Sequence, residues 1–286
     1  MKLIILSGRS GSGKSTALHQ LEDEGFYAID NLPVSLLPTL VKELSKSPLK
    51  VHQQVAVCID ARNSKDELSQ FQSLCQQVRH YADLRIIFLD AADDKLIKRF
   101  SETRRRHPLT TDAQPLADVI KLESALLEPI VIESSLTIDS SDMSVHDLRS
   151  TIRDRILGVD NSRLAVQLKS FGFKRALPID ADQVFDLRML PNPHWNEDLR
   201  RLTGRDDAVR DFLDQQDEVN AMYDDILHYL QRWLPRIEAG NRSYFTVAIG
   251  CTGGQHRSVY MVERLALSLR DRYPNLQVRH RELGSS

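Results

Sequence analysis

Gly8-Arg9-Ser10-Gly11-Ser12-Gly13-Lys14-Ser15 fits the pattern G-x-x-x-x-G-K-[S/T] at every position. The stretch lies between an apolar run, Lys2–Ser7, and an amphipathic one, Ser15–Glu24. Glycines let successive backbone N–H groups turn inward as an anion-binding nest, and the N-terminus of the following helix attracts negative charge. In such a loop the lysine reaches the β- and γ-phosphates of a nucleotide and the serine hydroxyl binds Mg²⁺. The sequence therefore predicts that residues 8–15 bind a nucleoside triphosphate.

The first half of the chain alternates short apolar runs with helical stretches. Several runs are almost entirely apolar and end in aspartate, which is typical of strands buried on both faces of a parallel sheet. A closing helix is expected at Ser144–Leu157, with the Ser144 side chain as its cap. The alternation predicts an α/β domain with a parallel sheet. Besides Lys2–Ser7, the expected strands are Tyr27–Asp30, Val55–Asp60, Arg85–Asp90 and Leu136–Asp139.

The pattern changes at Gly158–Ser162, which we interpret as a linker. A chain of 286 residues suits two domains of ordinary size. We therefore expect a nucleotide-binding domain at residues 1–157 and a smaller α/β domain at residues 163–286. The second domain has a polar loop at Pro178–Trp195. Its expected strands are Arg163–Ser170 and Tyr244–Ile249, and its expected helices are Asp206–Leu213, Glu218–Glu238 and Ser258–Arg272.

A nucleotide site also needs a carboxylate near the metal ion. Asp60, Asp90 and Asp30 each end an expected strand. We favour Asp60 as the metal ligand, together with Ser15, because Asp60-Ala61-Arg62-Asn63 places a carboxylate, a guanidinium and an amide beyond a strand. Ligands bind at that edge of an open α/β sheet. The alternative is that these aspartates only cap the next loop or helix.

Three consecutive arginines, Arg104, Arg105 and Arg106, follow the Asp90 strand and a helical stretch. In P-loop kinases, arginines on a mobile lid close over the transferred phosphate, and these residues fit that role. They fit equally well at the solvated end of a helix, where cations complement the helix dipole. Both interpretations stand on the sequence alone.

A second glycine-bearing loop, Gly250-Cys251-Thr252-Gly253-Gly254-Gln255-His256-Arg257-Ser258, also joins an apolar strand to a helix. It fits C-x5-R-[S/T], which resembles the phosphate loop of cysteine-dependent phosphatases. We favour a non-catalytic anion site. One alternative is a structural turn around a buried cysteine. The other is a phosphatase that uses Asp180, Asp182 or Asp186 of the polar loop as its acid.

The polar loop itself is dense in hydrogen-bonding side chains. Asp186, Arg188 and His194 lie in it, beside Asn192 and Trp195. A loop of this composition would suit closure over a phosphorylated small molecule. A packed segment between domains is the alternative.

The cysteines, the hydropathy and the net charge restrict the location and the partners that fit this sequence. Three cysteines that lie far apart predict no disulfide framework, so a reducing cytoplasm is the expected location. No apolar run approaches the roughly 20 residues that span a bilayer, so no membrane association is expected. The net charge of −2 neither favours nor excludes a nucleic-acid partner. One basic group is a candidate for RNA phosphate contacts, with an ordinary solvated face as the alternative: Arg270, Arg272, Arg279, His280 and Arg281.

Six motifs, in order along essentially the whole chain, resemble the RapZ/YvcJ family. The motifs are GRSGSGKS (8–15), FYAIDNLP (26–33), DARN (60–63), TRRRHPL (103–109), SFGFKRALPIDADQVFDLRMLPNPHW (170–195) and AIGCTGGQHRSV (248–259). Several long motifs in the same order are far more specific than the first loop alone.

The resemblance implies a first domain similar to P-loop kinases that binds ATP at Gly8–Ser15 or GTP near Asp60–Asn63, with weak hydrolysis. It implies a second domain that binds a small regulatory RNA, presents it to an endoribonuclease and senses glucosamine-6-phosphate, thereby controlling amino-sugar synthesis. The sugar phosphate would bind at Cys251–Ser258 with Asp186, Arg188 and His194. A homotetramer is also implied. A P-loop small-molecule kinase is the alternative.

Overall fold

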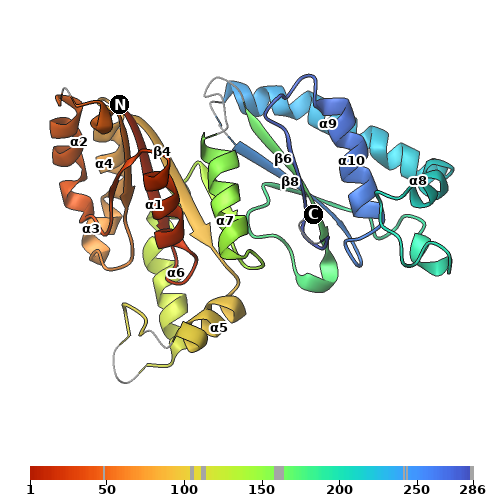
Figure 1. The fold of residues 1–286 in the computed structure, drawn as a ribbon, viewed down its shortest axis with the longest axis horizontal. Coiled ribbons are helices and arrows are strands. Elements are labelled where there is room, and N and C mark those ends of the chain that lie inside the picture. Colours follow the sequence, from red (N-terminus) through yellow and green to blue (C-terminus); the bar gives the residue numbers. More distant parts are fainter. Residues whose placement is uncertain are drawn as a thin grey trace. The chain divides into compact units, whose positions relative to one another are not determined.

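Each half of the chain folds around its own parallel β-sheet (Figure 1). The computed structural model describes residues 1–47, 49–103, 106–110, 114–157, 164–240, 242 and 244–283. The chain divides into two compact units, Met1–Leu157 (unit 1) and Gly158–Ser286 (unit 2). The predicted α/β fold class, with a P-loop domain followed by a second α/β domain, is confirmed.

The sheet of unit 1 has five parallel strands. They are β1 (Lys2–Gly8), β2 (Tyr27–Ile29), β3 (Gln54–Cys58), β4 (Asp83–Asp90) and β5 (Leu136–Asp139). Their order is β2-β3-β1-β4-β5, so β1 is central. Residues 3–8 of β1 are all buried. Burial on both faces explains why this strand has a continuous apolar sequence rather than an alternating one.

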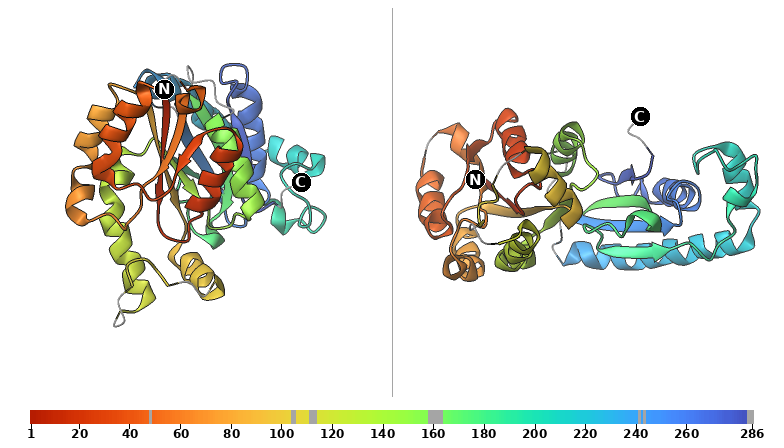
Figure 2. Two further views of the ribbon diagram at one scale, coloured as in Figure 1. Left: turned by 60° about the vertical axis from the view of Figure 1, so that its left-hand side comes forward. Right: turned by 90° about the horizontal axis from the view of Figure 1, so that it is seen from below.

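Helices cover both faces of this sheet (Figure 2). They are α1 (Lys14–Asp23), α2 (Leu37–Ser45), α3 (Lys65–Ser69), α4 (Phe71–Val78), α5 (Asp93–Thr103), α6 (Leu116–Glu133) and α7 (Val145–Ile152). α1 and α7 pack together, and side chains of α2, α4 and α6 share one core with Leu3 and Ile5 of β1. Ser144 caps α7 as predicted, but α7 ends at Ile152 and a π-helical turn follows it at Arg153–Leu157.

Unit 2 has a four-stranded sheet. Its strands are β6 (Ala165–Gly172), β7 (Gln183–Asp186), β8 (Tyr244–Cys251) and β9 (Gln277–His280), in the order β7-β8-β6-β9 and all parallel. The polar loop expected at Pro178–Trp195 therefore contains a strand, β7. No residue of β7 is fully buried, because the strand lies at the sheet edge, so it has no apolar pattern that the sequence could reveal.

The helices of unit 2 pack on one face of its sheet. They are α8 (Asp207–Asp214), α9 (Asp217–Ala239) and α10 (Arg257–Leu269), and their apolar side chains form one core with Leu168, Val247 and Ile249. Short 3₁₀ helices lie at Val34–Leu36, Lys50–Gln53, Phe173–Arg175 and Pro193–Trp195. None of the helices in the described ranges is long and apolar enough to cross a membrane.

Candidate functional site

The first glycine loop joins the central strand of unit 1 to a helix. β1 ends at Gly8 and α1 begins at Lys14, so the loop lies at the carboxyl edge of the sheet, where β3 and β4 also end. Gly13 has φ 102° and starts α1 without a side-chain cap. The first N–H groups of α1 are thus left for an anion. The Lys14 ammonium donates to the carbonyl oxygens of Gly8 at 2.7 Å and Arg9 at 3.2 Å, which holds it over the loop.

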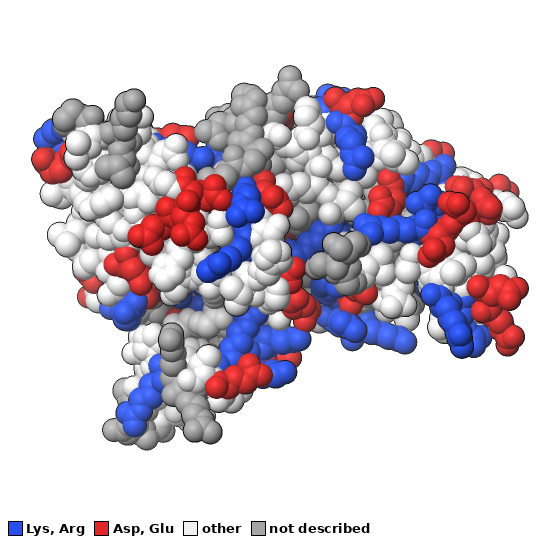
Figure 3. All heavy atoms as spheres, in the orientation of Figure 1, with Lys and Arg blue, Asp and Glu red and all other residues white. Residues whose placement is uncertain are grey.

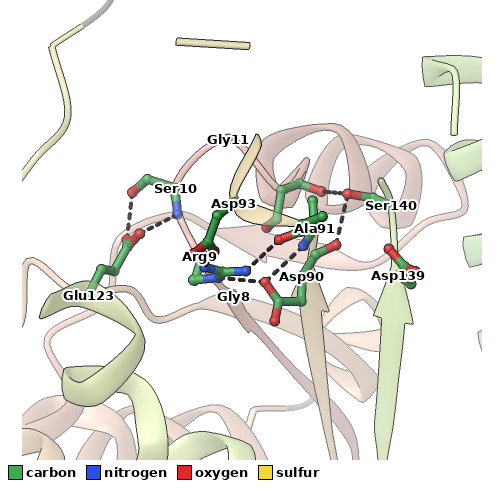
Figure 4. Close-up of polar contacts among 12 residues, drawn as sticks. Gly8, Arg9, Ser10, Gly11, Asp90, Ala91, Asp93, Glu123, Asp139 and Ser140 are labelled. Carbon is green, nitrogen blue, oxygen red and sulfur yellow. Dashed lines mark hydrogen bonds and ion pairs between the residues drawn. The ribbon is translucent and has the colours of Figure 1, made fainter. Parts of the chain in front are cut away.

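Arg9 anchors the loop with its side chain (Figure 4). Its Nε donates to Asp90 Oδ1 at 2.6 Å, its Nη1 to Asp93 Oδ1 at 2.5 Å, and its Nη2 to the carbonyl of Ala91. Burial raises the pKa of Asp90 even though Arg9 opposes that shift. The Arg9 side chain is 9% exposed and each of its three guanidinium nitrogens has one of these partners, so it holds the loop to β4 and α5.

Ser10 is held by a buried carboxylate that the sequence did not predict. Glu123 of α6 accepts the Ser10 N–H at 2.8 Å and the Ser10 hydroxyl at 2.7 Å (Figure 4). His107 Nε2 lies 3.0 Å from Oε2, the carboxylate oxygen that also accepts the Ser10 N–H, and the side chains of His107 and Glu123 are both 0% exposed. His107 Nδ1 accepts the N–H of Leu109, so Nε2 carries the proton and donates. This network ties the loop to the segment that follows the three arginines.

Arg99 is a second contact that the sequence did not single out. Its Nη1 donates to the carbonyl of Gly11 at 2.9 Å and to the Ser140 hydroxyl at 3.0 Å, and Ser140 donates to the carbonyl of Ser12 at 2.8 Å. Arg99 thus braces the loop from α5. Of the predicted lid arginines, Arg106 is exposed, and Arg104 and Arg105 lie outside the described residues.

Residues Asp60–Asn63 form a turn just after β3, the strand next to β1. The side chains of this turn form hydrogen bonds mainly within the turn. Arg62 Nε is 3.1 and 3.0 Å from the two Asp60 oxygens, and Arg62 Nη2 is 2.7 Å from Oδ2. Burial opposes ionisation of Asp60, but the hydrogen bonds from Arg62 outweigh it and lower the pKa of Asp60. Asn63 accepts the N–H of Val34 and donates to the carbonyl of Asp60, so its amide serves the turn rather than a ligand.

A metal site was predicted at Ser15 and Asp60. Nowhere in the described ranges do three or more His, Cys, Asp or Glu side chains gather as a metal cluster. Mg²⁺ is usually held by only one or two carboxylates plus phosphate oxygens, and a serine hydroxyl beside one carboxylate suits that pattern. The assignment stays a prediction, and Asp60 would exchange Arg62 for the metal.

The second glycine loop repeats the arrangement in unit 2. It lies between β8 and α10, and α10 begins without a side-chain cap. Cys251 is 3% exposed, and its Sγ accepts the N–H of Gly254 at 3.2 Å and lies 3.2 Å from the Ser258 hydroxyl. Thr252 and Gly253 are exposed. Two exposed residues thus lie next to a buried thiol, in the loop that leads into α10.

Arg257 braces this loop from inside. Its Nη1 donates to the carbonyls of Leu187, Arg188 and Leu190 at 3.2, 3.0 and 2.7 Å. The residue is 3% exposed, and burial lowers the pKa of the guanidinium. We expected Arg257 to bind the anion directly. Nη1 is engaged by three carbonyls of the β7 loop, whereas Nη2 donates to the Thr252 hydroxyl at 3.3 Å and the buried Nε has no hydrogen-bond partner among the described residues, so the anion contact stays a prediction.

Asp186 and Arg188 reproduce the geometry of Asp60 and Arg62. Arg188 Nε lies 3.0 and 2.9 Å from the two Asp186 oxygens, and Nη2 lies 2.7 Å from Oδ2. The Arg188 guanidinium also stacks on the ring of Phe173, 3.9 Å from its centroid. β7 neighbours β8 as β3 neighbours β1, so each glycine loop has an Asp-x-Arg turn on the adjacent strand.

His194 and Trp195 are presented to solvent near the start of α10. The ring of His194 is 6.3 Å from that of His256, and Trp195 is 78% exposed. Burial lowers the pKa of His256, which lies 3.2 Å from the carbonyl of Leu199. His256 is therefore neutral at neutral pH, and His194 is the more accessible of the two imidazoles.

Each aspartate that could act as the general acid of a cysteine phosphatase forms an ion pair with a lysine or an arginine. Lys169 is 2.5 Å from the Asp180 carboxylate in a buried pair, and Arg242 is 2.7 Å from Asp182. Asp186 is paired with Arg188. Because ionised, paired carboxylates are poor proton donors, this arrangement argues against the phosphatase alternative.

The side chains predicted to contact RNA differ in their exposure to solvent. Arg270 and Arg272 are exposed, and Arg279 is partly so. The His280 side chain is 3% exposed and lies 3.0 Å from Glu263, while that of Arg281 is 10% exposed. The structure therefore places the His280 and Arg281 side chains inside unit 2, and the assignment of these residues to RNA stays a prediction. Figure 3 shows Lys and Arg interspersed with Asp and Glu on the visible face.

A glycine loop of this pattern at the central strand of a parallel sheet defines a P-loop protein of the nucleotide-binding α/β class. The model of the RapZ-like N-terminal domain matches residues 1–160, and that of the RapZ C-terminal domain matches residues 164–284. The chain belongs to the RapZ family.

The curated relatives are named as nucleotide-binding proteins. One from Pseudomonas paraeruginosa is 54% identical over 100% of both chains. One from Saccharophagus degradans is 49% identical over 99% of this chain and 98% of its own. Among solved structures, shikimate kinase of Acinetobacter baumannii, bound to shikimate, covers 55% of this chain and 94% of its own, with 15% identity and a TM-score of 0.39. The strand order and the loop, rather than this score, define the fold of unit 1.

Proposed function

We propose that this chain is a nucleotide-binding RNase adapter of the cytoplasm. In this role, unit 1 binds ATP or GTP with Mg²⁺, and unit 2 binds a small regulatory RNA and promotes its cleavage by an endoribonuclease. Unit 2 also senses glucosamine-6-phosphate, and the chain works as a homotetramer. The observation that carries the proposal is the pair of uncapped helix N-termini, α1 and α10, each reached through a glycine loop beside an Asp-x-Arg turn.

The second loop is the proposed sugar-phosphate site. The uncapped start of α10 supplies N–H groups, and the exposed Thr252 hydroxyl and His194 imidazole supply further donors. Arg188 would turn from Asp186 toward a bound anion, since the side chains of Arg188 and Asp186 are both partly exposed. Arg257 holds the loop through Nη1, and its buried Nε, which has no partner among the described residues, is left as a donor for the anion.

Replacing His194 by alanine is expected to weaken glucosamine-6-phosphate binding about tenfold, because a hydrogen bond to a charged group is worth about 1.5 kcal/mol or more. Calorimetry on the full chain measures the affinity. His228→Ala, on the exposed face of α9, is the matched control and should bind like the unmodified chain. Absence of binding to the unmodified chain would remove the sensing role.

RNA binding is proposed to use the exposed arginines near the C-terminal end of α10. Arg270→Ala and Arg272→Ala should each weaken binding of a structured small RNA and reduce the slope of affinity against salt by about one. Salt-titrated binding measures both quantities, with Arg210→Ala on α8 as the control. Equal affinity for the RNA and a scrambled sequence at every salt concentration would eliminate the adapter role.

A further inference from the structure

The chain beyond β9 turns inward behind the second glycine loop. The N–H of Arg281 donates to the carbonyl of Ser170 at 3.1 Å. Its Nη2 donates to the carbonyls of Gly172, Arg175 and Ala176 at 3.0, 3.1 and 2.9 Å. The Arg281 guanidinium thus binds three carbonyls at the end of β6 and in the turn after it. The same turn faces the second glycine loop.

Glu282 completes this arrangement. Its side chain is 3% exposed. Oε1 accepts the N–H of Gly172 at 3.2 Å and Nε of Arg281 at 2.9 Å, and Oε2 lies 3.1 Å from Nε of Arg175. A carboxylate with three donors of this kind is fixed in position, because moving it would leave a buried charge unpaired.

The glycine loop packs against the methylene part of the Glu282 side chain. Gly254 has φ +72°, and a Cβ there would lie 2.3 Å from Cγ of Glu282 and 2.6 Å from the backbone nitrogen of Gly172. Only a residue without a side chain fits between the loop and the C-terminal segment. The same Gly254 donates its N–H to Sγ of Cys251 at 3.2 Å, so the contacts run from Glu282 through Gly254 to the thiol.

We propose that Glu282, held by Arg281, is a positioning residue of the second glycine loop. It fixes the Gly254 amide, and with it the N–H groups that an anion would meet before α10. Arg281 and Glu282 are therefore part of the anion site. The effect on ligand affinity rests on the proposed sugar-phosphate function, whereas the effect on the loop does not.

Cys251 offers a readout of the loop that needs no ligand. The other two cysteines, Cys58 and Cys75, lie buried in unit 1, and burial raises the pKa of each thiol to about 12. Cys251 is 3% exposed behind the loop, so its rate of alkylation by iodoacetamide at one fixed pH reports how often the loop opens, and mass spectrometry of its peptide isolates the signal. A loop that has lost the Glu282 contact opens more often, so alkylation of Cys251 becomes faster.

In Glu282→Ala, the alkylation rate of Cys251 at fixed pH is expected to rise about tenfold, because a hydrogen bond to a charged group is worth about 1.5 kcal/mol and the loop then opens more often. Affinity for glucosamine-6-phosphate should fall about tenfold. Asp271→Ala, an exposed acid just beyond α10, should change neither quantity. Glu282→Gln keeps the shape and should show a smaller shift in the same direction.

The outcomes separate the two claims. If the unmodified chain binds no sugar phosphate, the proposed function fails, while the alkylation rate of Cys251 still tests the position of the loop. An unchanged alkylation rate in folded Glu282→Ala overturns the positioning role. Should that variant unfold, an unchanged rate in folded Glu282→Gln has the same consequence.

Discussion

Replacing Lys14 by alanine is expected to weaken nucleotide binding by roughly 100-fold. Among the described residues, only the carbonyls of Gly8 and Arg9 hold its ammonium over the first loop. A bound phosphate can replace these two hydrogen bonds, so Lys14 is the cation best placed to contact it. Arg9 and Arg99 are committed to anchoring the loop, so neither can replace the lost charge. Losing one charge-assisted contact to a buried anion costs about 3 kcal/mol, which is a factor of roughly 100.

Calorimetry with ATP and with GTP on the full chain tests this expectation. Lys65→Ala removes an exposed lysine from the start of α3 in the same unit and should leave the affinity unchanged. Unchanged affinity in Lys14→Ala would show that the nucleotide binds elsewhere. The Asp60–Arg62 turn would then be the first place to look, because it lies at the same edge of the sheet.

The features that the sequence revealed are local ones. β5 begins at Leu136 and ends at Asp139 as predicted, and its alternation of apolar and polar residues matches an edge strand whose residues alternate between buried and half-buried. The first loop was recognisable because its glycines recur at fixed spacing between a strand and a helix. Ser144 was identifiable as a cap because its partner, Asp147, is only three residues away.

What the sequence did not reveal depends on partners far along the chain. Glu123 lies 113 residues from Ser10, and nothing in the local sequence of α6 distinguishes it from its acidic neighbours. Residue type also says nothing about burial. Arg257 and Arg281 were assigned to ligands because they are cations, and the structure adds that each also donates to backbone carbonyls that only the fold brings together.

Replacing Glu123 by alanine is expected to destabilise unit 1 by about 3 to 5 kcal/mol, since it leaves buried donors on Ser10 and His107 without an acceptor. Both tryptophans, Trp195 and Trp233, belong to unit 2, so their fluorescence follows that unit as an internal control. Hydrogen exchange of the β1 and β4 peptides then reports unit 1. Glu128→Ala, on the exposed side of the same helix, should stay within about 0.5 kcal/mol of the unmodified chain.

The dependence of this loss on pH identifies the charge as its source. Burial alone would raise the pKa of Glu123, but hydrogen bonds from His107 and Ser10 and the nearby Lys14 charge outweigh it and lower the pKa below 4.5. The unfolded chain therefore binds more protons than the folded one just below that value. The contribution of Glu123 is fully present above pH 4.5 and is lost as the pH falls through the folded pKa. The stability difference between the unmodified chain and Glu123→Ala should narrow across that acidic range, and a difference independent of pH would mean that packing, not the carboxylate, stabilises the loop.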